Sequence, residues 1–167
     1  NGFGRIGRVA LRVLYDRGWH TSVAAVNDLT DAPTLGHLLK YDSNYRVFKA
    51  AVSSRLYDNT PPYSGAITVD DHAFYVLSVK EPLELPWNQL GVDVVIESTG
   101  RFTKPEDMKK HLQAGAKKVI LSAPVEGEGV PTIVRGVNDK DLTDDTTLVA
   151  RAEMPDLLAA WGVEMEP

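Results

Sequence analysis

Apolar residues recur at helical spacing near the start of the chain. Between residues 5 and 17 they fall on one stripe, at Ile6, Val9, Ala10, Val13 and Leu14. This spacing predicts an amphipathic helix, and Gly18 can end it in a left-handed conformation. The continuous apolar run 23–26 then predicts a strand covered on both faces, as in a parallel sheet. A second helix is predicted to begin at Asp31 and Pro33, with a buried stripe at Leu35, Leu38 and Leu39.

The middle of the chain has a different pattern. Residues 67–69 and 72–79 flank the pair Asp70-Asp71 and predict an antiparallel hairpin. Pro61-Pro62 and Ser64-Gly65 predict a loop before this hairpin.

Buried-strand runs return in the second half of the chain, at 92–96, 118–121 and 132–134. Thr103, Pro105 and Glu106 form the pattern of a capping box and predict a helix that ends near Ala114, before Gly115. Strands that alternate with helices predict an α/β fold, a doubly wound (Rossmann-type) mostly parallel sheet with a small antiparallel hairpin insertion. Because the chain opens directly in a glycine loop, we expect the first, central strand of such a sheet to be missing.

Composition narrows the classes of function. The 167 residues carry a formal net charge of −5, which gives no support for nucleic-acid binding, and no run approaches the length of a membrane span. The chain has no cysteine, which excludes disulfides and a cysteine nucleophile within it. Its four histidines show no ligand spacing, so no metal site is expected. His111 lies near the end of a predicted helix beside Lys109 and Lys110, where positive charge favours the helix dipole. We expect a cytoplasmic protein.

The first chemical motif is a glycine loop of the form G-x-G-x-x-G, made by Gly2, Gly4 and Gly7. Such glycines allow a tight turn and a close approach of backbone N–H groups to a pyrophosphate. Asp28 follows the next predicted strand and lies 21 residues after Gly7 (28 − 7). A carboxylate there can accept hydrogen bonds from the adenosine ribose and repel a 2′-phosphate, which predicts NAD as the cofactor in preference to NADP.

These motifs resemble the glyceraldehyde-3-phosphate dehydrogenase family. The resemblance rests on the following segments in order: NGFGRIGR from residue 1, AVNDL from 25, LKYDS from 39, LPW from 85, GVDVVIESTG from 91, GAKKVILSAP from 115 and GVN from 136. It implies an NAD-binding Rossmann domain at residues 1–150, incomplete at its N-terminus, and a divergent tail at residues 151–167. The catalytic domain of the family would then be absent from this chain.

The resemblance also implies roles for individual residues in binding the cofactor. The glycine loop would contact the pyrophosphate, with Arg5 and Ile6 supplying backbone N–H groups. Asp28 would bind the adenosine ribose, next to Asn27. Other implied contacts come from Lys80 near the adenine, where the family usually has Arg, from Thr99 and Phe102 at the adenine pocket, from Ser98 and Gly100 beside the cofactor, and from Ser122 near the nicotinamide.

The family's reaction is the NAD-dependent phosphorylating oxidation of glyceraldehyde 3-phosphate by a homotetramer, and it needs a cysteine thiolate. Met154 falls near the cysteine position, so no catalytic residue is assigned here and the chain alone is expected to be inactive. Two alternatives stay open: oxidation of erythrose 4-phosphate, and a non-catalytic NAD-binding module. Neither a nucleic acid nor a membrane is expected as a partner; the substrate would be a small phosphorylated aldehyde.

Overall fold

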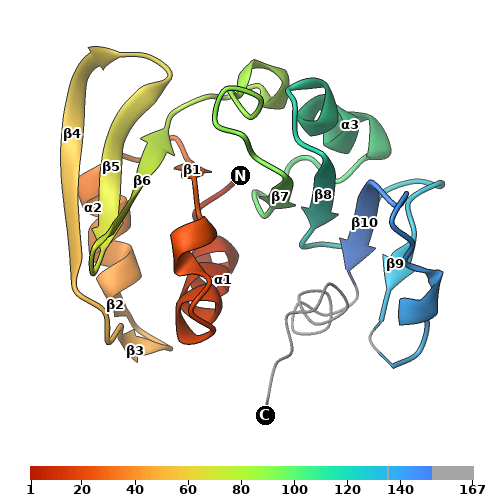
Figure 1. Cartoon of the computed structure of the whole chain (residues 1–167), viewed down its shortest axis with the longest axis horizontal. Coiled ribbons are helices and arrows are strands. Elements are labelled where there is room, and N and C mark those ends of the chain that lie inside the picture. Colours follow the sequence, from red (N-terminus) through yellow and green to blue (C-terminus); the bar gives the residue numbers. More distant parts are fainter. Residues whose placement is uncertain (135, 152–167) are drawn as a thin grey trace. The chain divides into compact units, whose positions relative to one another are not determined.

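The computed structural model of the protein describes residues 1–134 and 136–151. Its internal contacts divide the chain into two compact units, Asn1–Leu85 and Pro86–Pro167 (Figure 1). Met154 and the predicted divergent tail, apart from residue 151, lie outside the described residues. No helix of the described ranges combines the length and apolar character needed to cross a membrane.

The first unit contains a four-stranded sheet with two helices. Its elements are α1 (Arg5–Asp16), β1 (Ala25–Asn27), α2 (Ala32–Lys40), β2 (Tyr41–Asp42), β3 (Arg46–Val47), β4 (Val52–Thr60), β5 (Tyr63–Val69) and β6 (His72–Leu77), with 3-10 turns at His20–Ser22 and Pro82–Glu84. The strand order is β1-β6-β5-β4, in which β1 is parallel to β6 and the other pairs are antiparallel. Strands β2 and β3 form a separate antiparallel pair. The predicted hairpin is therefore confirmed as β5 and β6, and Asp70 at their turn has a φ of 53°.

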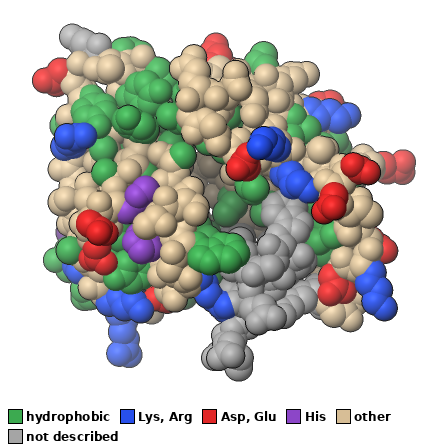
Figure 2. All heavy atoms as spheres, in the orientation of Figure 1, with side chains coloured by type: hydrophobic (Ala, Val, Ile, Leu, Met, Phe, Trp, Pro, Cys, Tyr) green, Lys and Arg blue, Asp and Glu red, His purple; other side chains and the backbone are tan. Residues whose placement is uncertain are grey.

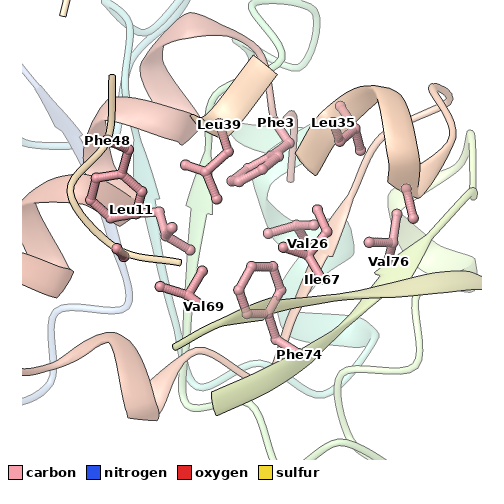
Figure 3. Close-up of a cluster of buried hydrophobic side chains, with 12 residues drawn as sticks. Phe3, Leu11, Val26, Leu35, Leu39, Phe48, Ile67, Val69, Phe74 and Val76 are labelled. Atoms are coloured by element: carbon pink, nitrogen blue, oxygen red, sulfur yellow. The ribbon is translucent and has the colours of Figure 1, made fainter. Parts of the chain in front are cut away.

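The core of the first unit forms where the helices meet the sheet. Figure 3 shows Leu11 of α1 and Leu39 of α2 beside Ile67, Val69 and Val76 of the sheet. All of these side chains are buried. The predicted stripes are only partly confirmed. In α1 the buried residues are Ala10 of the stripe and Leu11 outside it, whereas Ile6 is 39% exposed. In α2, Leu35 and Leu39 are buried as predicted, but Leu38 is 37% exposed. Asp31 caps α2 by accepting a hydrogen bond from the Thr34 N–H at 2.9 Å, and Gly18 follows α1 with a φ of 73°, as predicted.

The second unit is a parallel sheet with one described helix. It contains β7 (Val94–Glu97), α3 (Pro105–Gln113), β8 (Lys118–Leu121), β9 (Thr132–Ile133) and β10 (Leu148–Arg151), with a 3-10 turn at Asp139–Asp141. The strand order is β7-β8-β10-β9, and every pair in it is parallel. The predicted strands at 92–96, 118–121 and 132–134 are confirmed with small shifts of their ends. Figure 2 shows acidic and basic side chains interspersed over one face of the described residues.

Three local predictions are wrong, and two strands were not predicted. Ser64 and Gly65 lie inside β5 rather than in a loop, and β4, which precedes it, was not predicted at all. The capping box does not form, because Lys104 is the N-cap of α3 and no side chain of the described residues caps this helix. Strand β10 was also missed, although it lies between β8 and β9. His111 is fully buried, so it does not act as an exposed cation at the end of α3.

Candidate cofactor site

The glycine loop of the first unit leads directly into α1. Gly2 has a φ of 84°, and its N–H donates to the carbonyl oxygen of Asn27 at 2.8 Å, which ties the loop to the end of β1. Gly4 is the N-cap of α1, and within the described residues no side chain caps this helix and no acidic residue lies in its first turn. A Cβ placed on Gly4 would meet no atom within 4 Å. The helix start, with Arg5 and Ile6 exposed, therefore offers backbone donors and open space for a phosphate.

Asp28 joins the glycine loop to the end of β1. Its Oδ2 accepts the Phe3 N–H at 2.9 Å, and its Oδ1 accepts the Thr30 N–H at 3.0 Å. The backbone N–H of Asp28 donates to the carbonyl oxygen of Leu77 on β6 at 3.1 Å. The half-buried carboxylate is thus fixed in orientation. Because each ionised oxygen has two acceptor positions, each can accept a further hydrogen bond from a sugar hydroxyl.

Asn27 is buried, and its side chain hydrogen-bonds Val79 just after the end of β6. Its side chain is buried, its Nδ2 donates to Asn1 Oδ1 at 2.6 Å and to the carbonyl oxygen of Val79 at 2.9 Å, and its Oδ1 accepts the Val79 N–H at 2.9 Å. These bonds place the residue that precedes the exposed Lys80. The structure therefore brings together the glycine loop, Asp28 and the segment of Lys80. A direct contact of Asn27 with a cofactor stays a prediction.

The other predicted residues lie in the second unit, at the carboxyl ends of two adjacent parallel strands. Glu97, the last residue of β7, is in register with Leu121 of β8, and the Ser122 N–H donates to the carbonyl oxygen of Glu97 at 2.9 Å. Ser98 and Ser122 therefore follow neighbouring strands at one sheet edge, the edge at which α/β proteins bind ligands. Gly100 continues the loop after β7 with a φ of 70°, a conformation that favours glycine.

Phe102 ends this loop as a half-buried side chain beside α3. The Nζ of Lys110 lies 6.0 Å from the centroid of its ring. This distance is at the outer limit of a cation–π contact. The ring is thus partly exposed, and a contact of Phe102 with adenine stays a prediction.

A buried polar network beneath the same loop was not anticipated as part of the site. Glu97 Oε1 accepts both the N–H and the hydroxyl of Thr99, at 2.8 and 2.5 Å, and Glu97 Oε2 lies 3.0 Å from Nε2 of His111. The indole N–H of Trp87 donates to Nδ1 of His111 at 3.0 Å. Burial lowers the pKa of His111, and the hydrogen bond that His111 makes to Glu97 opposes this shift. The available sequence signal was the position of His111 three residues after Met108, on the buried face of α3.

These features define a dinucleotide-binding domain of the Rossmann type: a glycine loop that opens a helix, an acid at the end of the next strand and a parallel sheet with loops at its carboxyl edge. Residues 1–105 match the family described as "Glyceraldehyde 3-phosphate dehydrogenase, NAD binding domain". The chain belongs to this family. The match confirms the family resemblance, the Rossmann-type fold and NAD as the cofactor.

Curated relatives agree with the family. The chain is 46% identical over 157 residues to glyceraldehyde-3-phosphate dehydrogenase of Borreliella burgdorferi, covering 91% of this chain and 44% of the relative. It is 50% identical over 138 residues to the proteins of the same name from Streptomyces coelicolor and Geobacillus stearothermophilus, covering 83% of this chain and 38% of each relative. The chain thus spans less than half the length of these relatives.

Proposed function

We propose that this chain is the NAD-binding part of an enzyme that oxidises glyceraldehyde 3-phosphate with phosphorylation, in glycolysis or gluconeogenesis. The observation that carries the proposal is the Asp28 carboxylate, which is held by the Phe3 N–H of the glycine loop at the end of β1. The names of the relatives support glyceraldehyde 3-phosphate over erythrose 4-phosphate as the substrate. No observation on the described residues favours a non-catalytic module.

The residues of the first unit fit the pyrophosphate and ribose of NAD. The space around Gly4 and the uncapped start of α1 suit a phosphate, and Asp28 suits the two hydroxyls of the adenosine ribose. In this proposal Gly2, Gly7, Arg5 and Ile6 supply backbone around the pyrophosphate. Lys80 contributes a positive charge on the adenine side as a single ammonium rather than a bidentate fork. Asn27 contributes by holding Val79 in place.

The residues of the second unit suit contacts with a planar base and with polar groups. We assign Thr99 and Phe102 to the adenine, Ser98 and Gly100 to backbone close to the cofactor, and Ser122 to the nicotinamide end. NAD supplies the hydride-accepting chemistry of the reaction. The contribution of this chain is to bind and orient the dinucleotide, because its 167 residues include no cysteine that could attack an aldehyde.

Assembly and location follow the same family relationship. We propose that the complete enzyme is a homotetramer in the cytoplasm, acting on a small phosphorylated aldehyde without a nucleic-acid or membrane partner. The thiolate and the remaining catalytic groups would come from sequence other than these 167 residues.

The decisive experiment compares the unmodified protein with Gly4→Ala. Alanine tolerates the backbone at Gly4 (φ −68°), and the added methyl has open space, but alanine is a poorer N-cap than glycine. We therefore expect the midpoint of thermal unfolding to fall only slightly. The methyl instead fills the space assigned to the pyrophosphate, so the Kd for NAD should rise at least about tenfold in calorimetric titration. Equal NAD affinity in the two proteins would contradict the proposed placement of NAD, and failure of the unmodified protein to bind NAD would contradict the function.

A further inference from the structure

Glu97 and His111 are the two ionisable side chains that the described part of the chain buries completely. Both have side chains of 0% exposure, and they belong to different elements of the second unit, β7 and α3. A buried carboxylate is costly unless hydrogen bonds replace its water. Hydrophobic side chains of similar size would fill this volume without that cost. The pair therefore calls for an explanation beyond packing.

Two hydrogen bonds to Glu97 come from one residue of the loop that follows β7. Oε1 accepts both the backbone N–H and the hydroxyl of Thr99, so a single oxygen fixes the main chain and the rotamer of that residue. The Thr99 hydroxyl oxygen in turn accepts the Arg101 N–H at 3.1 Å. The loop after β7 is thus organised around one buried carboxylate.

The orientation of this carboxylate is set from the opposite side. An indole N–H can only donate, so Trp87 requires an unprotonated Nδ1 on His111. The proton of the neutral imidazole then lies on Nε2, where it is donated to Glu97 Oε2. Trp87 therefore donates to His111, and His111 donates to Glu97. The Glu97 carboxylate also accepts the two hydrogen bonds from Thr99.

We infer that Glu97 and His111 are positioning residues for cofactor binding: they hold residues 98–101 in the conformation that presents Thr99 to the adenine end of NAD. This inference rests on the proposed function, because it assigns a task to a loop placed there at the cofactor. Neither residue needs to touch NAD. Their effect is to order the loop before the cofactor arrives, which removes an entropic cost from binding.

The test compares Glu97→Gln with the unmodified protein. The glutamine carbonyl can still accept from Thr99, but its amide then points N–H donors at the Nε2–H of His111. We expect the Kd for NAD to rise about tenfold, the equivalent of one lost hydrogen bond. In the protein without NAD, amide hydrogen exchange at Thr99 and Arg101 should accelerate by a similar factor. In the protein without NAD, the conservative Thr99→Ser, which keeps the hydroxyl, should leave exchange at Arg101 nearly unchanged, whereas Thr99→Val should accelerate it.

Val119→Ala is the matched control. Val119 is fully buried in β8 of the same sheet but makes none of the bonds of the loop, so its truncation lowers stability without disturbing Thr99. We expect a reduced unfolding midpoint with unchanged NAD affinity and unchanged exchange at Thr99. If Glu97→Gln gives this same result, Glu97 is merely structural and the inference is overturned. If the unmodified protein does not bind NAD, the proposed function fails, and the exchange rates without NAD still decide whether Glu97 orders the loop.

Discussion

The indole N–H of Trp87 donates to Nδ1 of His111 at 3.0 Å and thereby determines which imidazole nitrogen carries the proton. Protonation of His111 would place a second N–H at Nδ1, facing the indole. Burial lowers the pKa of His111, and the adjacent Glu97 carboxylate opposes this effect without reversing it. A neutral His111 is therefore part of the folded state near neutral pH.

This relationship predicts a stability that depends on pH. The pKa of His111 in the folded state is below its unfolded value of about 6.5, so at intermediate pH the unfolded chain binds a proton that the folded chain does not. The stabilisation that comes from neutral His111 is fully present when the pH is above the pKa of this histidine in the unfolded chain. As pH falls below about 6.5, the free energy of unfolding should decrease, by at most about 1.4 kcal/mol per pH unit for this one group, and the decrease ends below the folded pKa.

Denaturant unfolding from pH 7.5 to 5 measures this dependence. His111→Gln should flatten the profile over this range, whereas Val119→Ala, which removes no titratable group, should lower the whole profile without changing its slope. An equal slope in the unmodified protein and in His111→Gln would show that other groups dominate the titration.

The direction of donation also predicts coupling between positions 87 and 97. In Glu97→Gln, His111 can accept from the glutamine amide only by moving its proton to Nδ1, where it meets the Trp87 N–H. Trp87→Phe removes that donor. Each single substitution should destabilise the fold, and the double variant should be more stable than the sum of the two effects by about 1 kcal/mol.

A double-mutant cycle measures this coupling by denaturant unfolding at pH 7.5, followed by circular dichroism because Trp87 is itself a fluorophore. Strictly additive effects of the two substitutions would mean that positions 87 and 97 are not coupled through the protonated nitrogen of His111.

The elements that the sequence predicted are those with a strong apolar pattern. Helix α1 shows an apolar stripe, and β8 shows a continuous apolar run in which Val119, Ile120 and Leu121 are all buried. Strand β7 has the same kind of run, although Val94 is 41% exposed. Strand β4 was not predicted because it is an edge strand of its sheet and most of its side chains are polar and exposed. Gly65 carries a turn signal in sequence, but the packing of α2 on β5 overrides it.

The site was predictable where a motif places residues at the ends of strands. The spacing from the glycine loop to Asp28 anticipates their contact, because both must reach the carboxyl end of β1. The network of Glu97 was not predictable in this way. Its members come from three separate segments, and only the fold shows that Trp87, His111 and Thr99 converge on one carboxylate.

Asp28 predicts that the protein binds NAD in preference to NADP. Its carboxylate would repel the 2′-phosphate of NADP, and exposed Leu29 follows it where a cation would be needed to accept that phosphate. We expect the Kd for NAD to be at least about tenfold lower than that for NADP. Asp28→Asn should weaken NAD binding and narrow this difference, because the amide offers only one oxygen to Phe3, Thr30 and the ribose.

Asp31→Asn provides the matched control for this titration. It makes the same charge change three residues away, and asparagine is an equally good N-cap for α2. Its NAD and NADP affinities should equal those of the unmodified protein. Tighter binding of NADP than NAD by the unmodified protein would refute the role of Asp28.

Gly65 and Gly36 predict opposite outcomes for the same substitution at the contact between α2 and the sheet. A Cβ on Gly65 would overlap the backbone carbonyl oxygen of Arg55 on the paired strand and lie 2.7 Å from the Cβ of Ala32, and neither atom can move without shifting β4 or α2. Gly65→Ala should therefore lower the free energy of unfolding by about 3 kcal/mol. A Cβ on Gly36 lies 3.3 Å from the Cβ of Ser54, a tight contact that a shift of a few tenths of an ångström relieves, and 3.4 Å from the Ser54 hydroxyl oxygen, which can rotate away.

The gain in helix propensity decides the sign at Gly36. Alanine is favoured over glycine inside a helix by about 1 kcal/mol, and Ser54 on the exposed β4 can yield the few tenths of an ångström that the methyl needs. Gly36→Ala should thus leave stability unchanged or raise it. Denaturant unfolding of both variants under one condition measures the contrast. Equal stability of the two variants would mean that α2 does not pack as closely on Gly65 of β5 as the structure indicates. Ser64 and Gly65 would then form a loop, as the sequence predicts, rather than part of β5.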